Sequence, residues 1–195
     1  ELSGYQDNAN IPMLLATREE GGSYNQISPY VRGIPYASTQ EIFSGGGYDA
    51  IIANTTEKSE FLLSLGVNVN FSPIANVTWD YQGPLYPRTF GYSASKTAKY
   101  VSKVIETMDD AGIGNVVSYF PLYSEGVQED YQVLEALQNT NFVTFQQAIH
   151  SDADAVLVSH SIVHSIDNEN PASLSLKTHK LLRQDLKFEG VIICD

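Results

Sequence analysis

The sequence predicts a parallel α/β fold, in which short buried strands alternate with amphipathic helices. Five apolar runs have the length of buried parallel strands, at residues 11–16, 67–71, 116–120, 155–159 and 191–194. Segments with helical periodicity lie between these runs. Such alternation is typical of a sheet that is either doubly wound or closed into a (β/α)8 barrel, and periodicity alone does not distinguish the two.

The clearest helix is expected after Ser93, a candidate N-cap. Its apolar residues step by three and four along the chain, and Gly112 stands just past its end, where a left-handed residue is favoured. Other helical segments are expected at residues 61–65, as a shorter helix at 145–149, and at 181–186. Clusters of Gly and Pro predict loops at residues 44–47 and 80–87.

Length and charge restrict the classes of protein and partner. A chain of 195 residues fits one domain with a substantial core. Its 23 Asp and Glu against 11 Lys and Arg give a net charge of -12, which would repel the phosphates of a nucleic acid. We therefore expect no nucleic-acid partner, whereas a neutral sugar is compatible with this acidity.

Cysteine, histidine and glycine usage argues against several kinds of site. Cys194 is the single cysteine, so neither an internal disulfide nor a multi-cysteine metal site can form. No pair of histidines combines metal-ligand spacing with a third ligand. The glycine run at residues 45–47 follows no predicted strand, whereas a dinucleotide-binding turn would follow one. We expect no metal and no cofactor.

Hydropathy predicts no membrane association, because no apolar stretch approaches the roughly 18 to 20 residues of a membrane span. The first ten residues also lack the order of a signal peptide. The compartment stays open between the cytoplasm and secretion with a leader removed.

Several motifs occur in a fixed order along the chain. They are IPMLLATREEGG at residues 11–22, GVNVNFSPIANV at 66–77, RTFG at 88–91, ADAVLVSH at 153–160, PASLS at 171–175 and LLRQDLKFEGVIICD at 181–195. In this order, and over nearly the whole chain, they resemble the catalytic barrel domain of glycoside hydrolase family 3. The Val-Ser-His and Pro-Ala-Ser-Leu-Ser stretches resemble the bacterial β-N-acetylhexosaminidase branch of that family.

The resemblance implies a (β/α)8 barrel of the TIM type that is incomplete in this chain. It begins at the family's second barrel strand and stops at Asp195, whereas a complete barrel typically needs about 250 residues. We expect residues 1–195 to form a single family 3 N-terminal-like domain that lacks the first and last barrel units. Open sheet edges would then favour self-association.

The resemblance also implies retaining hydrolysis of O-glycosidic bonds, with β-N-acetylhexosaminides as candidate substrates. This chemistry needs a carboxylate nucleophile and a second group that acts as acid and base. Asp195 follows an apolar strand and matches the family nucleophile. Arg88 matches an arginine that reaches the sugar, and His160 matches a histidine at a strand end near the site. We expect these three residues to converge on one pocket at the carboxyl ends of the strands.

The middle of the chain departs from the family pattern. The signature Lys-His-Phe-Pro-Gly-His-Gly, which supplies sugar-binding groups and an acid/base histidine, is replaced by SYFPLYS at residues 118–124. Arg18 stands where the family has a sugar-binding aspartate, so an acceptor of hydrogen bonds is exchanged for a donor-only group. Ser23 replaces an arginine and Asn76 an aspartate. A new ligand at the Arg18 position, or none, is implied.

Two hypotheses follow for the missing acid/base. Tyr123, with an ordinary pKa near 10, is a poor proton shuttle at neutral pH, whereas Glu125 aligns with the acidic member of the family's loop dyad and Glu129 lies nearby. The first hypothesis is a glycosidase with Asp195 as nucleophile and Glu125 as acid/base. The alternative is a catalytically inactive relative that acts as a carbohydrate-binding or structural module.

Overall fold

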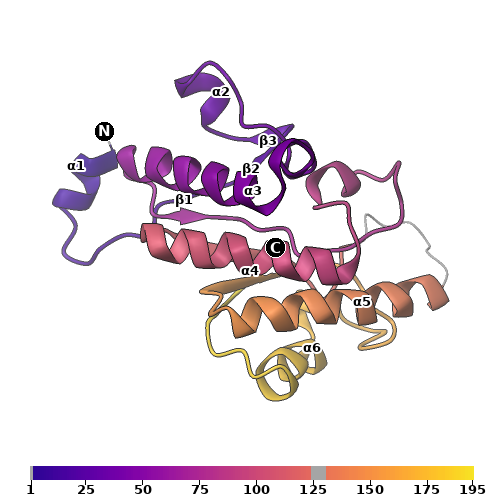
Figure 1. The fold of residues 1–195 in the computed structure, drawn as a ribbon. Helices are drawn as coiled ribbons and strands as arrows, with labels where there is room; N and C mark the ends of the chain where they lie inside the picture. The colour runs from indigo at the N-terminus through magenta and orange to yellow at the C-terminus, as the bar shows by residue number, and fades with distance from the viewer. Residues whose placement is uncertain (1, 124–130) are drawn as a thin grey trace.

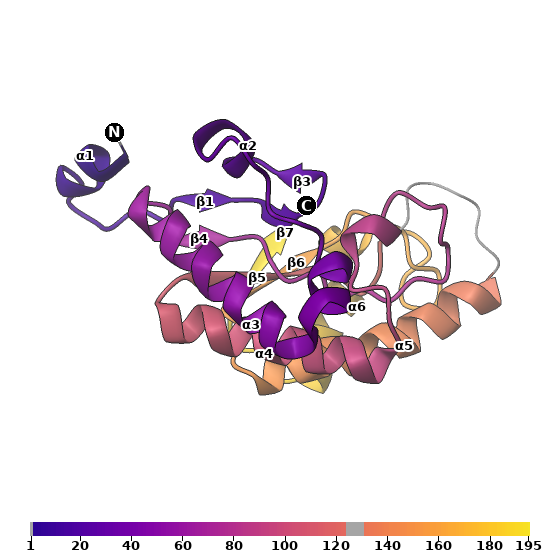
Figure 2. The same ribbon diagram turned by 45° about the horizontal axis from the view of Figure 1, so that its top comes forward.

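A five-stranded sheet forms the centre of the computed structural model, which describes residues 2–123 and 131–195 (Figures 1 and 2). Its strands are β1 (Ala16–Thr17), β4 (Val69–Asn70), β5 (Gly114–Phe120), β6 (Ala155–Val158) and β7 (Val191–Cys194). All pairings are parallel, and the spatial order β1-β4-β5-β6-β7 is the order along the chain. A doubly wound sheet reverses its order at a switch point, so this sequential order is the winding of a barrel wall.

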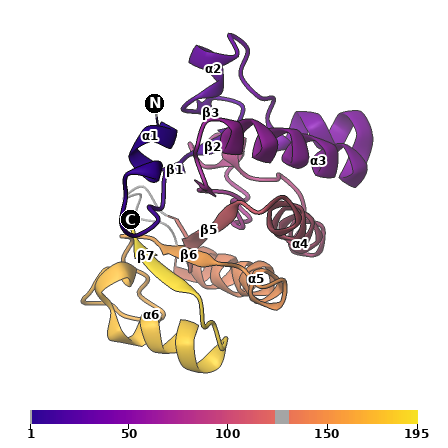
Figure 3. The same cartoon turned by 90° about the vertical axis from the view of Figure 1, so that its left-hand side faces the viewer.

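Helices cover one side of this sheet (Figure 3). They are α3 (Thr39–Ser64), α4 (Ala94–Ala111), α5 (Tyr131–His150) and α6 (Leu176–Lys180), which the π-helix η3 (Leu181–Asp185) continues. Figures 1 and 2 show α3, α4 and α5 side by side, and α4 packs against both of the others. This layer of helices along one side of a parallel sheet is the arrangement that the resemblance implied.

Shorter elements complete the described chain. They are α1 (Leu2–Asp7), the antiparallel pair β2 (Glu19–Gly21) and β3 (Tyr24–Asn25), α2 (Ser28–Val31), η1 (Tyr86–Arg88) and η2 (Ala172–Leu174). Within the described ranges, no helix has the length and apolar character needed to cross a membrane.

The core lies on both faces of the sheet, because side chains alternate along its strands. On β6, Val156 and Val158 point toward the helices, whereas Ala155 and Leu157 join Ile74 on the opposite face. Burial on both faces explains why the central strands read as continuous apolar runs in the sequence.

The first strand is shorter than predicted, and its position differs. Ile11 and Leu14 are 79% and 80% exposed, and only Ala16 and Thr17 pair with β4. Upstream of this pair, side-chain amides form hydrogen bonds with the backbone N–H and C=O groups. Gln6 both donates to and accepts from Met13, and the Asn68 side chain accepts from Leu15 N at 2.7 Å. These amides take the place of ladder hydrogen bonds at Met13 and at Leu15 N, whereas Leu15 O still accepts from Asn68 N and Val69 N, so the strand begins only at Ala16.

Two further boundaries differ from the prediction. The glycine run predicted as a loop lies inside α3, where Gly46 and Gly47 depart from helical dihedral angles and kink the helix. The helix predicted near residues 145–149 is the end of α5, which has 20 residues. The helix α4 agrees with the prediction: Ser93 is its N-cap and Gly112, at φ 76°, its left-handed C-cap, although Ser93 makes no side-chain capping bond.

Candidate functional site

The carboxyl ends of the parallel strands lie along one edge of the sheet. The last residues of β5, β6 and β7 stand opposite one another, and the segment after β4 runs on beside β5 through a bridge between Ile74 and Ser118. Charged and aromatic residues end or follow these strands, namely Arg18, Glu20, Tyr119, His160 and Asp195. In barrel enzymes this edge carries the catalytic groups.

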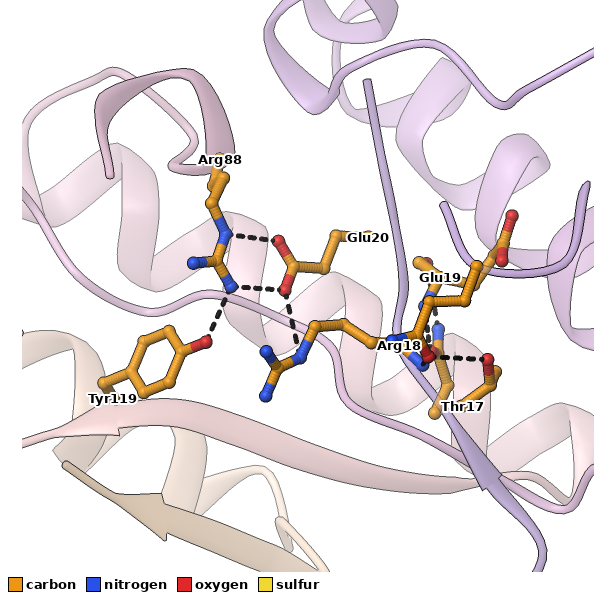
Figure 4. Close-up of polar contacts among 8 residues, drawn as sticks. Thr17, Arg18, Glu19, Glu20, Arg88 and Tyr119 are labelled. Carbon is orange, nitrogen blue, oxygen red and sulfur yellow. Dashed lines mark hydrogen bonds and ion pairs between the residues drawn. The ribbon is translucent and has the colours of Figure 1, made fainter. Parts of the chain in front are cut away.

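Arg88 and Glu20 form the central ion pair of this edge (Figure 4). The guanidinium donates from Nε and Nη2 to the two carboxylate oxygens at 2.9 and 2.7 Å, and Nη2 also donates to the Tyr119 hydroxyl at 2.6 Å. Both charged side chains are buried, at 6% and 5% exposed. Burial alone would lower the pKa of Arg88, but the bonds and charge of Glu20, with Tyr119, outweigh it and raise the pKa above its ordinary value.

The backbone around Glu20 explains the glycines that follow it. Gly21 has φ 115°, and a Cβ there would lie 2.4 Å from the Ala37 carbonyl oxygen. Lys58, on α3, donates from Nζ to the Glu20 carbonyl oxygen at 3.1 Å. Burial lowers the pKa of Lys58 to about 8, although Glu19 and Glu20 act in the opposite direction. The backbone at Glu20 is therefore fixed in two ways. Gly21 allows the chain to pass close to the Ala37 carbonyl oxygen, and Lys58 binds the Glu20 carbonyl oxygen.

The segment that carries Arg88 is fixed by its neighbours in the RTFG motif. Phe90 is fully buried and stacks on Tyr100 at 4.5 Å between ring centroids. Gln40, on α3, donates from Nε2 to the carbonyl oxygens of Tyr86 and Thr89 at 2.9 and 3.1 Å. Arg88 therefore extends from an anchored turn, which fixes where its guanidinium lies.

Tyr119 is positioned by Asn76. The Asn76 side chain accepts from Tyr119 N at 2.6 Å and donates to Tyr119 O at 2.9 Å, and it is buried. An aspartate could accept from Tyr119 N but could not donate to its carbonyl oxygen. Asn76 in this chain therefore supports the framework of the site.

Arg18 lies beside the Arg88–Glu20 pair (Figure 4). Its Nε is 3.7 Å from Glu20 Oε1, and its side chain is 32% exposed. Its guanidinium lies over the rings of Phe71 and Tyr119, 5.8 and 5.9 Å from their centroids. Arg18 and Arg88 thus share a single carboxylate.

Glu19, next to Glu20, holds the local fold. Its carboxylate accepts from Ile27 N and Ser28 N at 2.9 and 3.1 Å, at the start of α2, and its backbone exchanges two hydrogen bonds with the Asn70 side chain. The side chain is completely buried. The Glu19 carboxylate therefore binds backbone N–H groups, whereas the Glu20 carboxylate binds Arg88.

His160 and Asp195 lie at the neighbouring strand ends of β6 and β7. His160 Nδ1 is 2.7 Å from Ser173 Oγ, and Asp195 N donates to Val158 O at 3.0 Å. Both residues are exposed. Ser173 also links the two ends, because its carbonyl oxygen accepts from Cys194 Sγ at 3.5 Å.

The structure thus brings Arg18 and Arg88 together through Glu20, and Ser173 contacts both His160 and Cys194, the residue before Asp195. Among the described residues, no hydrogen bond or ion pair joins these two groups, and their convergence on one pocket stays a prediction. Glu125 and Glu129 lie outside the described residues. Those residues also contain no group of three His, Cys, Asp or Glu that could hold a metal.

Sequence reasoning missed Glu20 and Tyr119 as parts of the site. Glu20 belongs to the EEGG motif, and the carboxylate in that motif could have been predicted to pair with an arginine. Tyr119 occupies a position where the family pattern has another residue type, and its contact with Arg88 depends on the pairing of distant segments.

A barrel wall with charged residues along its carboxyl edge defines a domain of the (β/α)8 barrel class. The chain belongs to glycosyl hydrolase family 3, because residues 3–195 match the model of the Glycosyl hydrolase family 3 N terminal domain.

Named relatives agree with this membership. The β-hexosaminidase of Photobacterium profundum is 24% identical over 190 residues, which cover 94% of this chain and 56% of the relative. The β-hexosaminidase LpqI of Mycobacterium tuberculosis is 22% identical over 197 residues, covering 95% and 50%. The chain therefore spans about half the length of these relatives.

Solved structures show the same fold. LpqI of M. tuberculosis superposes with a TM-score of 0.85 at 20% identity, covering 100% of this chain and 60% of that one. The family 3 β-N-acetylglucosaminidase of Paenibacillus sp. str. FPU-7 gives a TM-score of 0.84 at 23% identity, covering 100% and 39%. The barrel-type fold predicted from the sequence is confirmed.

Proposed function

We propose that this chain is the barrel portion of a retaining glycoside hydrolase, with Asp195 as its nucleophile. The observation that carries the proposal is that Asp195 directly follows β7, at the edge of the sheet that also holds the Arg88–Glu20 pair. A carboxylate at the carboxyl end of a barrel strand can attack the anomeric carbon of a sugar held by the surrounding loops.

The substrate that we propose is a carbohydrate, with β-N-acetylhexosaminides as the first candidates. The names of the relatives support this class, since they include β-hexosaminidases and a β-N-acetylglucosaminidase. Glu125 is our candidate for the acid that protonates the leaving oxygen and then activates water.

Arg88 is our candidate for contact with the sugar. Glu20 and Tyr119 occupy its Nε and Nη2, whereas Nη1 makes no hydrogen bond within the described part of the chain. That nitrogen can donate to a sugar oxygen while the other two hold the guanidinium in place. His160, beside Asp195, is a second candidate for contact with substrate.

We also propose that the chain self-associates through the sheet face that lies opposite the helices. A cavity of about 570 Å³ opens toward the amino ends of the strands on this face, and its apolar lining residues include Leu14, Val69, Val116, Ala155 and Ile193. Apolar side chains around a cavity of this size favour burial against another surface. Analytical ultracentrifugation over a range of concentrations tests this proposal, and a monomer throughout would contradict it.

The experiment that tests hydrolysis compares aryl and alkyl β-N-acetylglucosaminides with the protein that carries this chain. An aryl leaving group departs without help, whereas an alkyl group needs a positioned acid, whose assistance is worth roughly 10² to 10⁴ in rate. We expect Asp195→Asn to abolish turnover of both substrates, and Glu125→Gln to slow the alkyl substrate selectively.

Asp110→Asn is the matched control, because Asp110 is an exposed aspartate on α4, within the helix layer. It should leave turnover unchanged. Turnover that survives Asp195→Asn would overturn the assignment of the nucleophile. Sugar binding without any turnover would instead support the carbohydrate-binding alternative.

A further inference from the structure

Among the residues that the structure describes, two arginines face the single carboxylate of Glu20. Arg88 takes both oxygens of Glu20 at hydrogen-bond distance. Arg18 reaches the same carboxylate only at 3.7 Å, beyond the range of a hydrogen bond. Two guanidinium groups therefore face one carboxylate, in a chain whose net charge is -12.

The other charged groups near the site have other partners. The Glu19 carboxylate accepts from two backbone amides at the start of α2, and it is completely buried. Lys58 donates from Nζ to the Glu20 carbonyl oxygen and forms no ion pair with either carboxylate within the described ranges. Among the described residues, Arg18 and Arg88 both face the Glu20 carboxylate, and Arg18, at 32% exposed, is the more accessible of the two cations.

Arg18 is held in a manner that suits ligand binding. Its backbone N–H donates to Gln26 Oε1 at 2.9 Å, and its guanidinium lies over two aromatic rings, Phe71 and Tyr119. Aromatic faces restrain a guanidinium and leave the N–H groups at its edge available for a planar acceptor. Within the described ranges, those N–H groups make no hydrogen bond.

We propose that Arg18 binds the carboxylate of an acidic sugar, so that this site selects carboxylated glycans over neutral ones. The inference rests on the proposed function in one respect, namely that this edge of the barrel binds carbohydrate. A carboxylate offers two coplanar oxygens that match the guanidinium fork, and it would give the two arginines a second carboxylate. A neutral hydroxyl offers neither feature.

The test measures binding of matched sugar pairs by isothermal titration calorimetry. The first pair is methyl β-glucuronide, which carries its carboxylate at C6, and methyl β-glucoside. The second pair is N-acetylmuramic acid, which carries its carboxylate on an ether at O3, and N-acetylglucosamine. We expect at least one carboxylated sugar to bind about tenfold more tightly than its neutral counterpart, because charged hydrogen bonds are among the stronger ones. The pair that shows this preference identifies the position of the carboxylate.

Arg18→Gln should remove the preference, because it weakens binding of the carboxylated sugar about tenfold more than binding of the neutral sugar. Arg32→Gln is the matched control. Arg32 also has a side chain that is 32% exposed, lies over two aromatic rings and pairs with a glutamate, but it lies beyond α2. The preference should also weaken as salt rises from low to physiological ionic strength. Circular dichroism of both variants checks that the fold is retained.

The inference is overturned if neither carboxylated sugar binds more tightly than its neutral partner, or if Arg32→Gln reduces the preference as much as Arg18→Gln. These results differ from failure of the proposed function. An Arg18-dependent preference without Asp195-dependent hydrolysis would support the inference and contradict the proposed hydrolase function. Asp195-dependent hydrolysis together with equal binding of the carboxylated and neutral sugars would leave the proposed function standing and overturn the inference.

Discussion

Arg88 donates two hydrogen bonds to the Glu20 carboxylate, although the two residues are 68 positions apart in the sequence. The pair joins the segment after β1 to the segment after β4, and the Tyr119 hydroxyl brings in the end of β5. A buried pair of this kind is costly to break, because the remaining charge would be buried without a partner.

Replacement of Glu20 by alanine should destabilise the protein by about 3–5 kcal/mol, the usual cost of leaving one buried charge alone. Urea unfolding at neutral pH measures the change. Glu57→Ala is the control, since Glu57 forms an exposed pair with Arg32 at 2.7 Å, and such a loss costs about 1 kcal/mol or less. Equal losses for both variants would show that burial does not strengthen the Glu20 pair.

Gly21→Ala should be more destabilising than Gly33→Ala, although both glycines have positive φ. At Gly33, with φ 75°, no atom lies within 4 Å of an added Cβ, so the variant should lose only the cost of left-handed backbone, about 1–2 kcal/mol. At Gly21 the added Cβ would also meet the Ala37 carbonyl oxygen at 2.4 Å. Thermal unfolding of the two variants measures the difference, and similar melting temperatures would contradict the clash.

The buried ammonium of Lys58 should make stability depend on alkaline pH. Its pKa in the folded protein is about 8, against an ordinary value of 10.5, chiefly because of burial. Between these values the unfolded chain holds a proton that the folded chain has released, so the free energy of unfolding should rise with pH across this window.

The measurement for Lys58 is the difference in free energy of unfolding between the native protein and Lys58→Met, at pH 7.5 and pH 10. The difference should shift in favour of the native protein by on the order of 1–3 kcal/mol, since one pKa unit corresponds to about 1.4 kcal/mol. Lys103→Met supplies the same charge change at an exposed site on α4. A flat difference for Lys58→Met would refute the low pKa.

Phe90→Ala should cost about 3–5 kcal/mol, because it removes a fully buried ring and leaves a cavity beside Tyr100 and Phe43. Phe90→Leu fills most of this space and should cost much less. Tyr81→Ala, at an exposed tyrosine, should change stability by less than about 0.5 kcal/mol. Guanidinium unfolding ranks the three variants, and an Ala variant as stable as the Leu variant would contradict the packing role.

The sequence predicted the central strands well because they are buried on both faces and read as apolar runs. The prediction of a strand failed for residues 11–15, because the side-chain amides of Gln6 and Asn68 bind the backbone of Met13 and Leu15 N in place of a neighbouring strand. The kink at Gly46 and Gly47 was read as a loop, since local preference does not reveal that the helix resumes beyond them.

At the site, motif spacing identified Arg88, but not the residue that holds it. The pairing of Arg88 with Glu20 depends on how two distant loops meet, and no local pattern encodes that distance. The same holds for the Tyr119 hydroxyl and for the unequal sharing of Glu20 between two arginines. The roles of Asp195, His160 and Glu125 stay predictions.

The sequential order of the strands has a consequence for synthesis on the ribosome. Each strand pairs with the one made just before it, so no later segment has to be inserted between two earlier ones. Domains generally fold from the N-terminus as the chain emerges, and this order allows the sheet to grow by one strand at a time. Glu20 and Arg88 can therefore meet before β5 is made, and Tyr119 then joins a pair that already exists.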